Sequence, residues 1–239
     1  MILLMLDYDG TLAPIVRDPA RALMGREMAA TLARLAKRSD VVMAVISGRS
    51  LADLKRRVRL DNIYYAGCHG VEMEGPGWSY LHPRMAAVEV QVQKQEDRLR
   101  VMLAGVKRVI IENKRYALTV HYRRVAPTYP RAIARIARKA GEPFRRWLTM
   151  ESGRMIFEFK PAVDWNKGKA VATLLRLCQS DDPYPIYIGD DATDEQAFES
   201  LRAKGLTILV DNDERPRRTA AVLRLRSQRQ VRCFLRSLA

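Results

Sequence analysis

A run of five apolar residues that ends in two carboxylates constrains the fold of this chain most: residues 2–6, followed by DYDGT from Asp7. The run is too short to cross a membrane, and its lack of polar alternation is typical of a strand buried on both faces of a parallel sheet. Gly10 allows the backbone to turn sharply after the strand. In open α/β sheets, ligands bind beyond the carboxyl ends of the strands. The sequence therefore places Asp7 and Asp9 where a reaction site is expected, although DxDG alone could also be a simple turn.

The first and last thirds of the chain alternate apolar strands with amphipathic helices. The strands are expected at 2–6, 41–46, 63–66, 185–188 and 206–210, and the helices at 26–37, 50–58 and from Lys167 to Cys178. A short strand at 222–226 and a helix that begins after Ser227 end the pattern. Such alternation predicts an α/β, Rossmann-like parallel sheet covered by helices.

The middle of the chain has a different pattern, helix-strand-strand, which occurs twice. Its elements are expected at 86–103, 109–112, 117–122, 129–140, 147–151 and 155–159. Glycine and proline residues cluster just before it, at 75–77 and at Pro83, as at a boundary between units. We therefore predict a core made of residues 1–82 and 163–239, with a smaller α/β unit, residues 83–162, inserted into it.

The composition favours a soluble, cytoplasmic globular protein over a nucleic-acid or membrane protein. Lys and Arg number 42 against 27 Asp and Glu, a formal net charge of +15. This excess makes anionic partners plausible, but it is dispersed and accompanies no nucleic-acid-binding motif. The three widely spaced cysteines predict reduced thiols, and neither a signal peptide nor a membrane span is expected. We expect a monomer that binds neither a membrane nor a specific nucleic acid.

Polar residues follow four strands of the predicted core sheet. They are Asp7 with Asp9, Ser47, the segment 67–70, and Asp190 with Asp191. Parallel strands bring these ends to one edge, where two carboxylates about 4 Å apart would repel by roughly 4 kcal/mol at an effective dielectric constant near 20. A divalent cation would remove this cost, and oxygen ligands favour Mg²⁺ over Zn²⁺.

These side chains, together with Lys167, suit phosphoryl transfer. One carboxylate can attack phosphorus and hold it as an acyl phosphate, and a second can donate and accept the proton that the leaving group and the attacking water require. A hydroxyl, a lysine and a magnesium ion can stabilise the equatorial phosphate oxygens.

Seven strings of the sequence resemble the trehalose-6-phosphate phosphatases, a family of haloacid dehalogenase-like hydrolases. They are DYDGTLAPI from Asp7, ISGR from Ile46, AGCHG from Ala66, ENK from Glu112, LTVHYR from Leu118, KPAVDWNKGKA from Lys160 and YIGDDATDEQAF from Tyr187. The last two are long and specific, and the strings together cover nearly the whole chain. The resemblance implies a haloacid dehalogenase-like core with an inserted cap that closes over the site and excludes water.

The resemblance also implies a role for each matching residue in the hydrolysis of trehalose 6-phosphate. Asp7 would be the nucleophile and Asp9 the general acid and base, with Lys167 as the third catalytic residue. The phosphate would be bound by Gly10, Thr11, Ser47 and Lys167. Magnesium would be bound by Asp7, the backbone carbonyl of Asp9, Asp190 and Asp191. The sugar would be bound by Arg49, His69, Gly70, Glu112, Asn113, Lys114, His121, Arg123, Glu158 and Lys160.

Structural alternatives remain open for several of these residues. Ser47 and Arg49 could serve only to begin the helix that follows them, and His69 could be a packed turn residue. The charged residues expected on neighbouring strands of the inserted unit could form cross-strand pairs without binding a sugar. The substrate could also be another sugar phosphate, such as sucrose phosphate or mannosylglycerate phosphate, and a non-catalytic protein that binds a polyanion is a third hypothesis.

Overall fold

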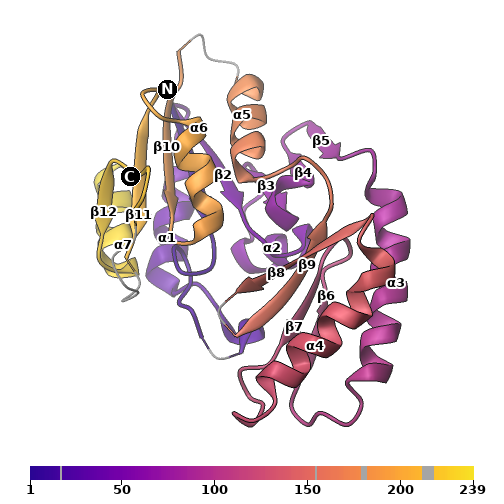
Figure 1. The fold of residues 1–239 in the computed structure, drawn as a ribbon. Coiled ribbons are helices and arrows are strands. Elements are labelled where there is room, and N and C mark those ends of the chain that lie inside the picture. The colour runs from indigo at the N-terminus through magenta and orange to yellow at the C-terminus, as the bar shows by residue number, and fades with distance from the viewer. Residues whose placement is uncertain (17, 154, 179–181, 212–217) are drawn as a thin grey trace. The chain divides into compact units, whose positions relative to one another are not determined.

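The chain folds into two compact units, drawn in the computed structural model of Figure 1. The structure describes residues 1–16, 18–153, 155–178, 182–211 and 218–239. Unit 1 comprises Met1–Tyr80 and Trp165–Ala239, and unit 2 comprises Leu81–Asp164. The boundaries that the sequence predicts, after residues 82 and 162, differ from these by two residues each.

Unit 1 contains an eight-stranded sheet in the order β12-β11-β10-β1-β2-β3-β4-β5. The strands are β1 (Ile2–Asp7), β2 (Val41–Ile46), β3 (Tyr64–Gly67), β4 (Glu72–Gly75), β5 (Trp78–Leu81), β10 (Tyr184–Gly189), β11 (Leu206–Val210) and β12 (Leu223–Leu225). All pairs from β12 to β3 are parallel, and β3 pairs with β4 in the antiparallel direction. The central strand β1 lies between β2 and β10, with Leu4 opposite both Met43 and Ile186.

Helices cover both faces of this sheet, which explains why its strands are continuously apolar. The helices are α1 (Arg26–Leu35), α2 (Leu51–Val58), α5 (Lys167–Leu177), α6 (Glu195–Ser200) and α7 (Gln228–Ser237). Alternate residues of β1 enter different cores: Leu4 and Leu6 pack with side chains of α1, α2 and α7. Leu3 and Met5 pack with side chains of α5 and α6. A strand buried on both faces in this way is typical of parallel sheets.

Unit 2 contains a four-stranded antiparallel sheet in the order β6-β7-β9-β8, with two long helices. Its elements are α3 (Met85–Met102), β6 (Ile110–Asn113), β7 (Leu118–His121), α4 (Pro130–Gly141), β8 (Leu148–Gly153) and β9 (Ile156–Pro161). Helix α4 packs on Phe159, since a Cβ added at Gly141 would lie 2.7 Å from its ring. Leu118 and Phe159 are buried beneath the helices, which leaves the opposite face of the sheet without a helical layer (Figure 1).

The predicted α/β class and the predicted order of elements are confirmed. The ends of the elements differ from those expected by at most two residues, the usual uncertainty where a helix frays or a strand leaves its sheet. Among the residues that the structure describes, no helix combines the length and apolar character that crossing a membrane requires.

Candidate active site

The carboxyl end of the parallel sheet brings Asp7 and Lys167 together, 160 residues apart in sequence. Asp7 is the last residue of β1, and Lys167 is the first residue of α5. The ammonium Nζ of Lys167 donates to Oδ1 of Asp7 at 2.6 Å and to Oδ1 of Asp194 at 2.6 Å. Both Lys167 and Asp194 are buried. Within the described residues, nothing donates to Oδ2 of Asp7, so this oxygen can attack a substrate or bind a cation.

Asp194 is the residue of this cluster that the sequence analysis missed. Its Oδ1 also accepts from the hydroxyl of Tyr187 at 2.6 Å. Its Oδ2 accepts from the backbone N–H groups of Asp190 and Asp191, at 3.0 and 2.9 Å. With four donors around it, Asp194 fixes both the Lys167 ammonium and the loop that carries Asp190. No local sequence signal indicated this role, because the burial of Lys167, which requires compensating carboxylates, is evident only in the structure.

Asp191, predicted as a metal ligand, caps the short helical turn that precedes α6. Its Oδ1 accepts from the backbone N–H of Ala192 at 2.5 Å, within a capping box that it forms with Asp194. It is exposed and does not belong to the cluster of carboxylates that could share an ion. The capping arrangement therefore begins at Asp191.

Three carboxylates of this edge lie close enough to bind one divalent cation. Asp7, Asp190 and Asp194 each offer an oxygen within 4.8 Å of the others. Of these, Asp194 already accepts four hydrogen bonds, so Asp7 and Asp190 are the better ligands. Oxygen donors of this kind suit a hard cation such as Mg²⁺. The residues present thus fit the metal that the sequence predicts, through Asp7 and Asp190.

The electrostatics of the cluster are those of carboxylates without enough positive charge. Burial raises the pKa of Asp7 to about 8; the Lys167 ammonium opposes this rise and the charge of Asp194 adds to it. Burial, followed by the charges of Asp7 and Asp194, also holds the pKa of Asp190 well above its ordinary value. Against burial, Asp194 and Asp7 keep the pKa of Lys167 well above its usual range. A bound cation would therefore favour the ionised form of both carboxylates.

The loop after β1 brings its backbone against Asp190. Gly10 has a φ of +86°, and a Cβ at this position would lie 2.0 Å from Oδ2 of Asp190. Its carbonyl accepts a hydrogen bond at 2.7 Å from Nε2 of Gln228, at the start of α7. The neighbouring Thr11 is buried, and its hydroxyl has no hydrogen-bond partner among the described residues. Such a hydroxyl is suited to bind a phosphate oxygen, as predicted for Thr11.

The loops after β2 and β3 lie against one another. Ser47 is buried, and the backbone N–H of His69 donates to its carbonyl at 2.9 Å. The His69 ring lies over Gly48, where an added Cβ would be 2.9 Å from the ring. Gly70 has a φ of +95°, and a Cβ there would meet Ala170 of α5 at 2.4 Å. Close packing is thus sufficient to explain Gly70, whereas His69 lies beside the predicted phosphate-binding serine.

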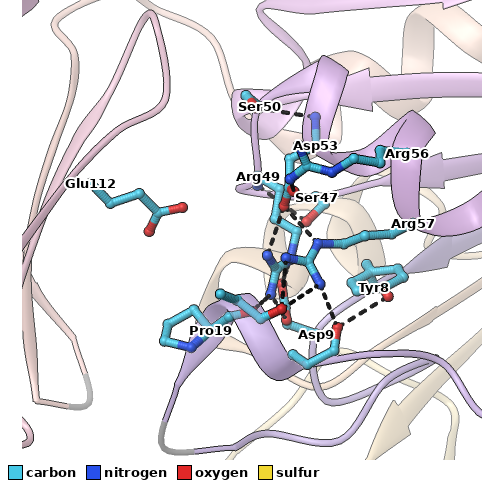
Figure 2. A network of polar contacts seen from close by, with 12 residues as sticks. Tyr8, Asp9, Pro19, Ser47, Arg49, Ser50, Asp53, Arg56, Arg57 and Glu112 are labelled. Atoms are coloured by element: carbon cyan, nitrogen blue, oxygen red, sulfur yellow. Dashed lines mark hydrogen bonds and ion pairs between the residues drawn. The ribbon is translucent and has the colours of Figure 1, made fainter.

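Arg49, predicted to bind sugar, uses its guanidinium within unit 1 (Figure 2). Its Nε and Nη2 donate to the two carboxylate oxygens of Asp9, at 2.7 and 2.6 Å. Nη2 also donates to the carbonyl of Pro19 at 2.9 Å, and Nη1 donates to Asp53 at 2.8 Å. The group lies 5.4 Å from the ring centroid of Tyr8. Arg49 is therefore a partner of Asp9, which the sequence analysis did not foresee.

Most of the predicted sugar-binding residues of unit 2 lie on the sheet face that the helices leave open. Glu112 is paired with Thr119, Thr119 with Glu158, and Glu158 with Glu151, so these four side chains share one face. His121 follows Thr119 by two residues and therefore shares this face. Its Nε2 is 2.8 Å from Oε2 of Glu112.

Two lysines join the same polar face. Lys114 donates to Glu158 at 2.7 Å, and Lys160 lies 3.8 Å from the other oxygen of Glu158. Arg123 lies beyond β7 and is partly buried. The cross-strand pairs expected as the structural alternative are thus present, and they gather the predicted residues into one cluster.

Asn113 is the exception, because it points to the helical face. Its Nδ2 donates to Glu96 of α3 at 2.6 Å, and its Oδ1 accepts from the backbone N–H of Arg115 at 2.7 Å. Both ends of the amide are therefore used within unit 2. Adjacent strand residues face opposite sides of a sheet, so Glu112 and Asn113 are directed to opposite sides.

Comparison with known proteins identifies a family model and named relatives. A model described as trehalose-phosphatase matches residues 5–228. A trehalose-phosphate phosphatase of Mycobacterium marinum is 38% identical over 98% of this chain. A trehalose 6-phosphate phosphatase of Zea mays is 35% identical over 100% of this chain and 70% of its own length. The chain spans about 60% of the length of the mycobacterial relative.

Solved structures show the same fold. The C-terminal domain of the trehalose-6-phosphate phosphatase of C. albicans is 26% identical, with a TM-score of 0.81 over 99% of this chain and 91% of its own. A haloacid dehalogenase-like hydrolase from Bacteroides thetaiotaomicron is 13% identical, with a TM-score of 0.71 over 100% of this chain and 99% of its own. The second likeness concerns the fold alone.

Proposed function

The chain belongs to the trehalose-phosphatase family, and on this premise we propose that it is a magnesium-dependent phosphatase that hydrolyses trehalose 6-phosphate. The observation that carries the proposal is the meeting of Asp7, Lys167 and Asp190 at one edge of the sheet. The names of the relatives support the substrate, and the acidic cluster supports the cation.

We propose that hydrolysis proceeds through a phosphorylated Asp7. Oδ2 of Asp7 attacks phosphorus as the bond from phosphorus to O6 of the sugar breaks, and Asp9 gives its proton to that oxygen. Asp9 then takes a proton from a water molecule, which attacks the aspartyl phosphate and restores the Asp7 carboxylate as inorganic phosphate leaves. This use of one carboxyl first as acid and then as base is ordinary general acid-base chemistry.

The other residues of unit 1 stabilise the phosphoryl group during both steps. The Lys167 ammonium, fixed by Asp194, carries positive charge beside Oδ1 of Asp7, the carboxylate oxygen that does not attack phosphorus. The buried hydroxyls of Ser47 and Thr11 are donors that can bind equatorial oxygens. A magnesium ion bound by Asp7, Asp190 and the backbone carbonyl of Asp9 would neutralise negative charge and polarise the phosphate.

We further propose that the polar face of unit 2 binds the sugar. Glu112, Lys114, His121, Glu158 and Lys160 provide charged donors and acceptors in one cluster, and disaccharide hydroxyls pair well with such groups. Asn113 is excluded from this set because its amide is engaged on the opposite face.

Phosphate release from a panel of sugar phosphates tests the proposal. Purified protein with Mg²⁺ is expected to hydrolyse trehalose 6-phosphate well ahead of sucrose 6-phosphate, mannosylglycerate phosphate and glucose 6-phosphate. Asp7→Asn is expected to abolish release, whereas Asp40→Asn, at an exposed residue that pairs with Arg38, is expected to keep it. Faster hydrolysis of another member of the panel would identify that compound, rather than trehalose 6-phosphate, as the substrate. Full activity of Asp7→Asn would refute the mechanism.

A further inference from the structure

We propose that Asp53 is a positioning residue for the general acid and base, because it fixes the guanidinium of Arg49 that binds the carboxylate of Asp9. This inference rests on the proposed function, in which Asp9 moves the proton. Asp53 belongs to the first turn of α2, and its carboxylate accepts hydrogen bonds from Arg49, Arg56 and Arg57. It acts through Arg49.

The geometry of Arg49 shows why its orientation matters to Asp9. Side-on binding of both carboxylate oxygens requires the guanidinium plane to lie in the plane of the carboxylate. Two other acceptors set that plane: the Asp53 carboxylate at Nη1 and the Pro19 carbonyl at Nη2. Among the residues that the structure describes, Arg49 is the sole donor to the Asp9 side chain. The direction of the Asp9 carboxyl therefore depends on how Arg49 is held.

The exposure of these groups indicates which of them is fixed and which can move. The Arg49 side chain is 6% exposed, whereas that of Asp9 is 40% exposed. Asp53 is itself anchored, since its backbone N–H donates to Oγ of Ser50 at the start of α2. The order of support thus runs from the helix to Asp53, then to Arg49, and finally to a carboxyl that solvent and substrate can reach.

Charge gives Asp53 a second effect on Arg49. Oδ2 of Asp53 accepts from Arg49 at 2.8 Å and from Arg57 at 2.7 Å, and each of these arginine side chains is 6% exposed. Burial alone would raise the pKa of Asp53, yet hydrogen bonds from Arg57 and Arg49 hold it below its ordinary value, so the group is ionised. Without this carboxylate, two buried guanidinium groups would repel each other, and Arg49 would move.

The Arg57 side of the network is fixed independently of Asp9. Nη1 of Arg57 donates at 2.9 Å to the carbonyl of Ala22, which also accepts from the Tyr8 hydroxyl at 3.2 Å. Arg57 therefore remains in place when Asp53 changes, and the displacement falls on Arg49. Figure 2 shows Arg49 and Arg57 with Asp53 in one network of polar contacts.

The test compares two phosphate esters that differ in their need for a proton. A sugar alkoxide must be protonated as it leaves, whereas 4-nitrophenolate leaves readily without an acid. Because kcat/KM covers only the steps up to cleavage of the ester, it isolates the role of Asp9 as acid. A general acid contributes about 10²–10⁴-fold, so we expect Asp53→Asn to lower kcat/KM for trehalose 6-phosphate by roughly tenfold or more and that for 4-nitrophenyl phosphate less than about threefold.

Two further variants keep the test decisive. Arg56→Gln removes a 71% exposed partner of the same carboxylate and is expected to leave kcat/KM unchanged for both esters. If circular dichroism shows that Asp53→Asn does not fold, Arg49→Lys keeps the positive charge but cannot bind both oxygens of Asp9 side-on, and the same discrimination between esters is expected.

The outcomes separate this inference from the proposed function. Equal losses on both esters, no loss on either, or a loss found only in KM for the sugar phosphate would each overturn a positioning role for Asp53. Failure of the wild type to hydrolyse trehalose 6-phosphate would instead refute the proposed substrate, and the comparison would then use the sugar phosphate that the panel identifies.

Discussion

Replacing Asp194 by Asn is expected to destabilise the protein far more than the same change at Asp191, three residues earlier. The Asp194 carboxylate is completely buried and accepts from Lys167, Tyr187 and two backbone N–H groups. An amide retains one oxygen, but its NH₂ group must face either the ammonium or the two N–H donors. The variant therefore breaks a buried ion pair and leaves donors without acceptors.

The size of the effect follows from these contacts. Breaking a buried pair costs about 3–5 kcal/mol, and because Lys167 retains Asp7 we take the lower end. A buried donor left without an acceptor adds about 1–3 kcal/mol. We therefore expect a loss of roughly 4 kcal/mol in the free energy of unfolding, which corresponds to a fall of about 8–16 °C in Tm for a protein of this size.

The matched control is Asp191→Asn. Asp191 is exposed and caps a short helical turn, and Asn is as good an N-cap as Asp, so a change below about 0.5 kcal/mol is expected. Urea denaturation followed by circular dichroism measures both variants. Unfolding free energies of the two variants within 1 kcal/mol of each other would refute the inference that the four hydrogen bonds of Asp194, rather than the capped turn, stabilise this region.

Three further predictions concern pH, unit 2 and the loop after β1. In EDTA, Tm is expected to fall as the pH rises from about 4 towards 8. Burial raises the pKa of Asp7 in the folded protein from 3.8 to about 8, and stability is lost as such a group ionises. Thermal melts of the wild type and Asp7→Asn measure this, and an equal dependence of Tm on pH in the variant would contradict it. Glu112→Gln is expected to raise KM for trehalose 6-phosphate severalfold. Asn113→Ala should leave KM unchanged and cost about 1–2 kcal/mol of stability, because the hydrogen bond to the Glu96 carboxylate is lost. Steady-state kinetics and urea denaturation measure the two effects, and equal changes in KM would contradict the assignment of Glu112 and Asn113 to opposite faces. Gly10→Ala is expected to lower activity at least tenfold, because the new methyl group would displace Asp190; magnesium titration of turnover would show a raised requirement, and a wild-type titration curve would contradict it.

The sequence was most informative where one residue type served one purpose. Continuous apolar runs indicated the parallel sheet, and a carboxylate directly after such a run indicated its functional edge. Asp7 and Asp190 could therefore be expected at the same edge from the sequence, because parallel strands end at one edge, whereas Lys167 was expected there from its match to the family's motifs.

Long-range partners could not be predicted in the same way. The TDE segment at Thr193 has the pattern of a helix start, and Asp194 does belong to a capping box, but nothing local indicates that it also binds a lysine 27 residues away. Arg49 is similar: an arginine after a strand suits an anionic ligand, and its partner Asp9 is 40 residues distant. Asn113 was a different case, because the alternation of strand side chains already directs it away from the face of Glu112.

Some expectations from the sequence stay predictions. That the protein is a monomer and that it does not bind a specific nucleic acid can be checked by analytical ultracentrifugation and by a salt-dependent binding assay. The formal net charge of +15 is relevant to both self-association and nucleic-acid binding.

The position of β1 in the middle of its sheet has a consequence for how the protein is made. One neighbour, β2, leaves the ribosome soon after β1, but the other, β10, begins only at Tyr184, after all of unit 2. At a synthesis rate of about 5–20 residues per second, this apolar strand waits roughly 10–35 seconds with one edge unpaired. During that interval the unpaired edge of β1 can pair with strands of other chains. The dependence of folding on chaperones in the cell should therefore increase with the delay before β10 is synthesised.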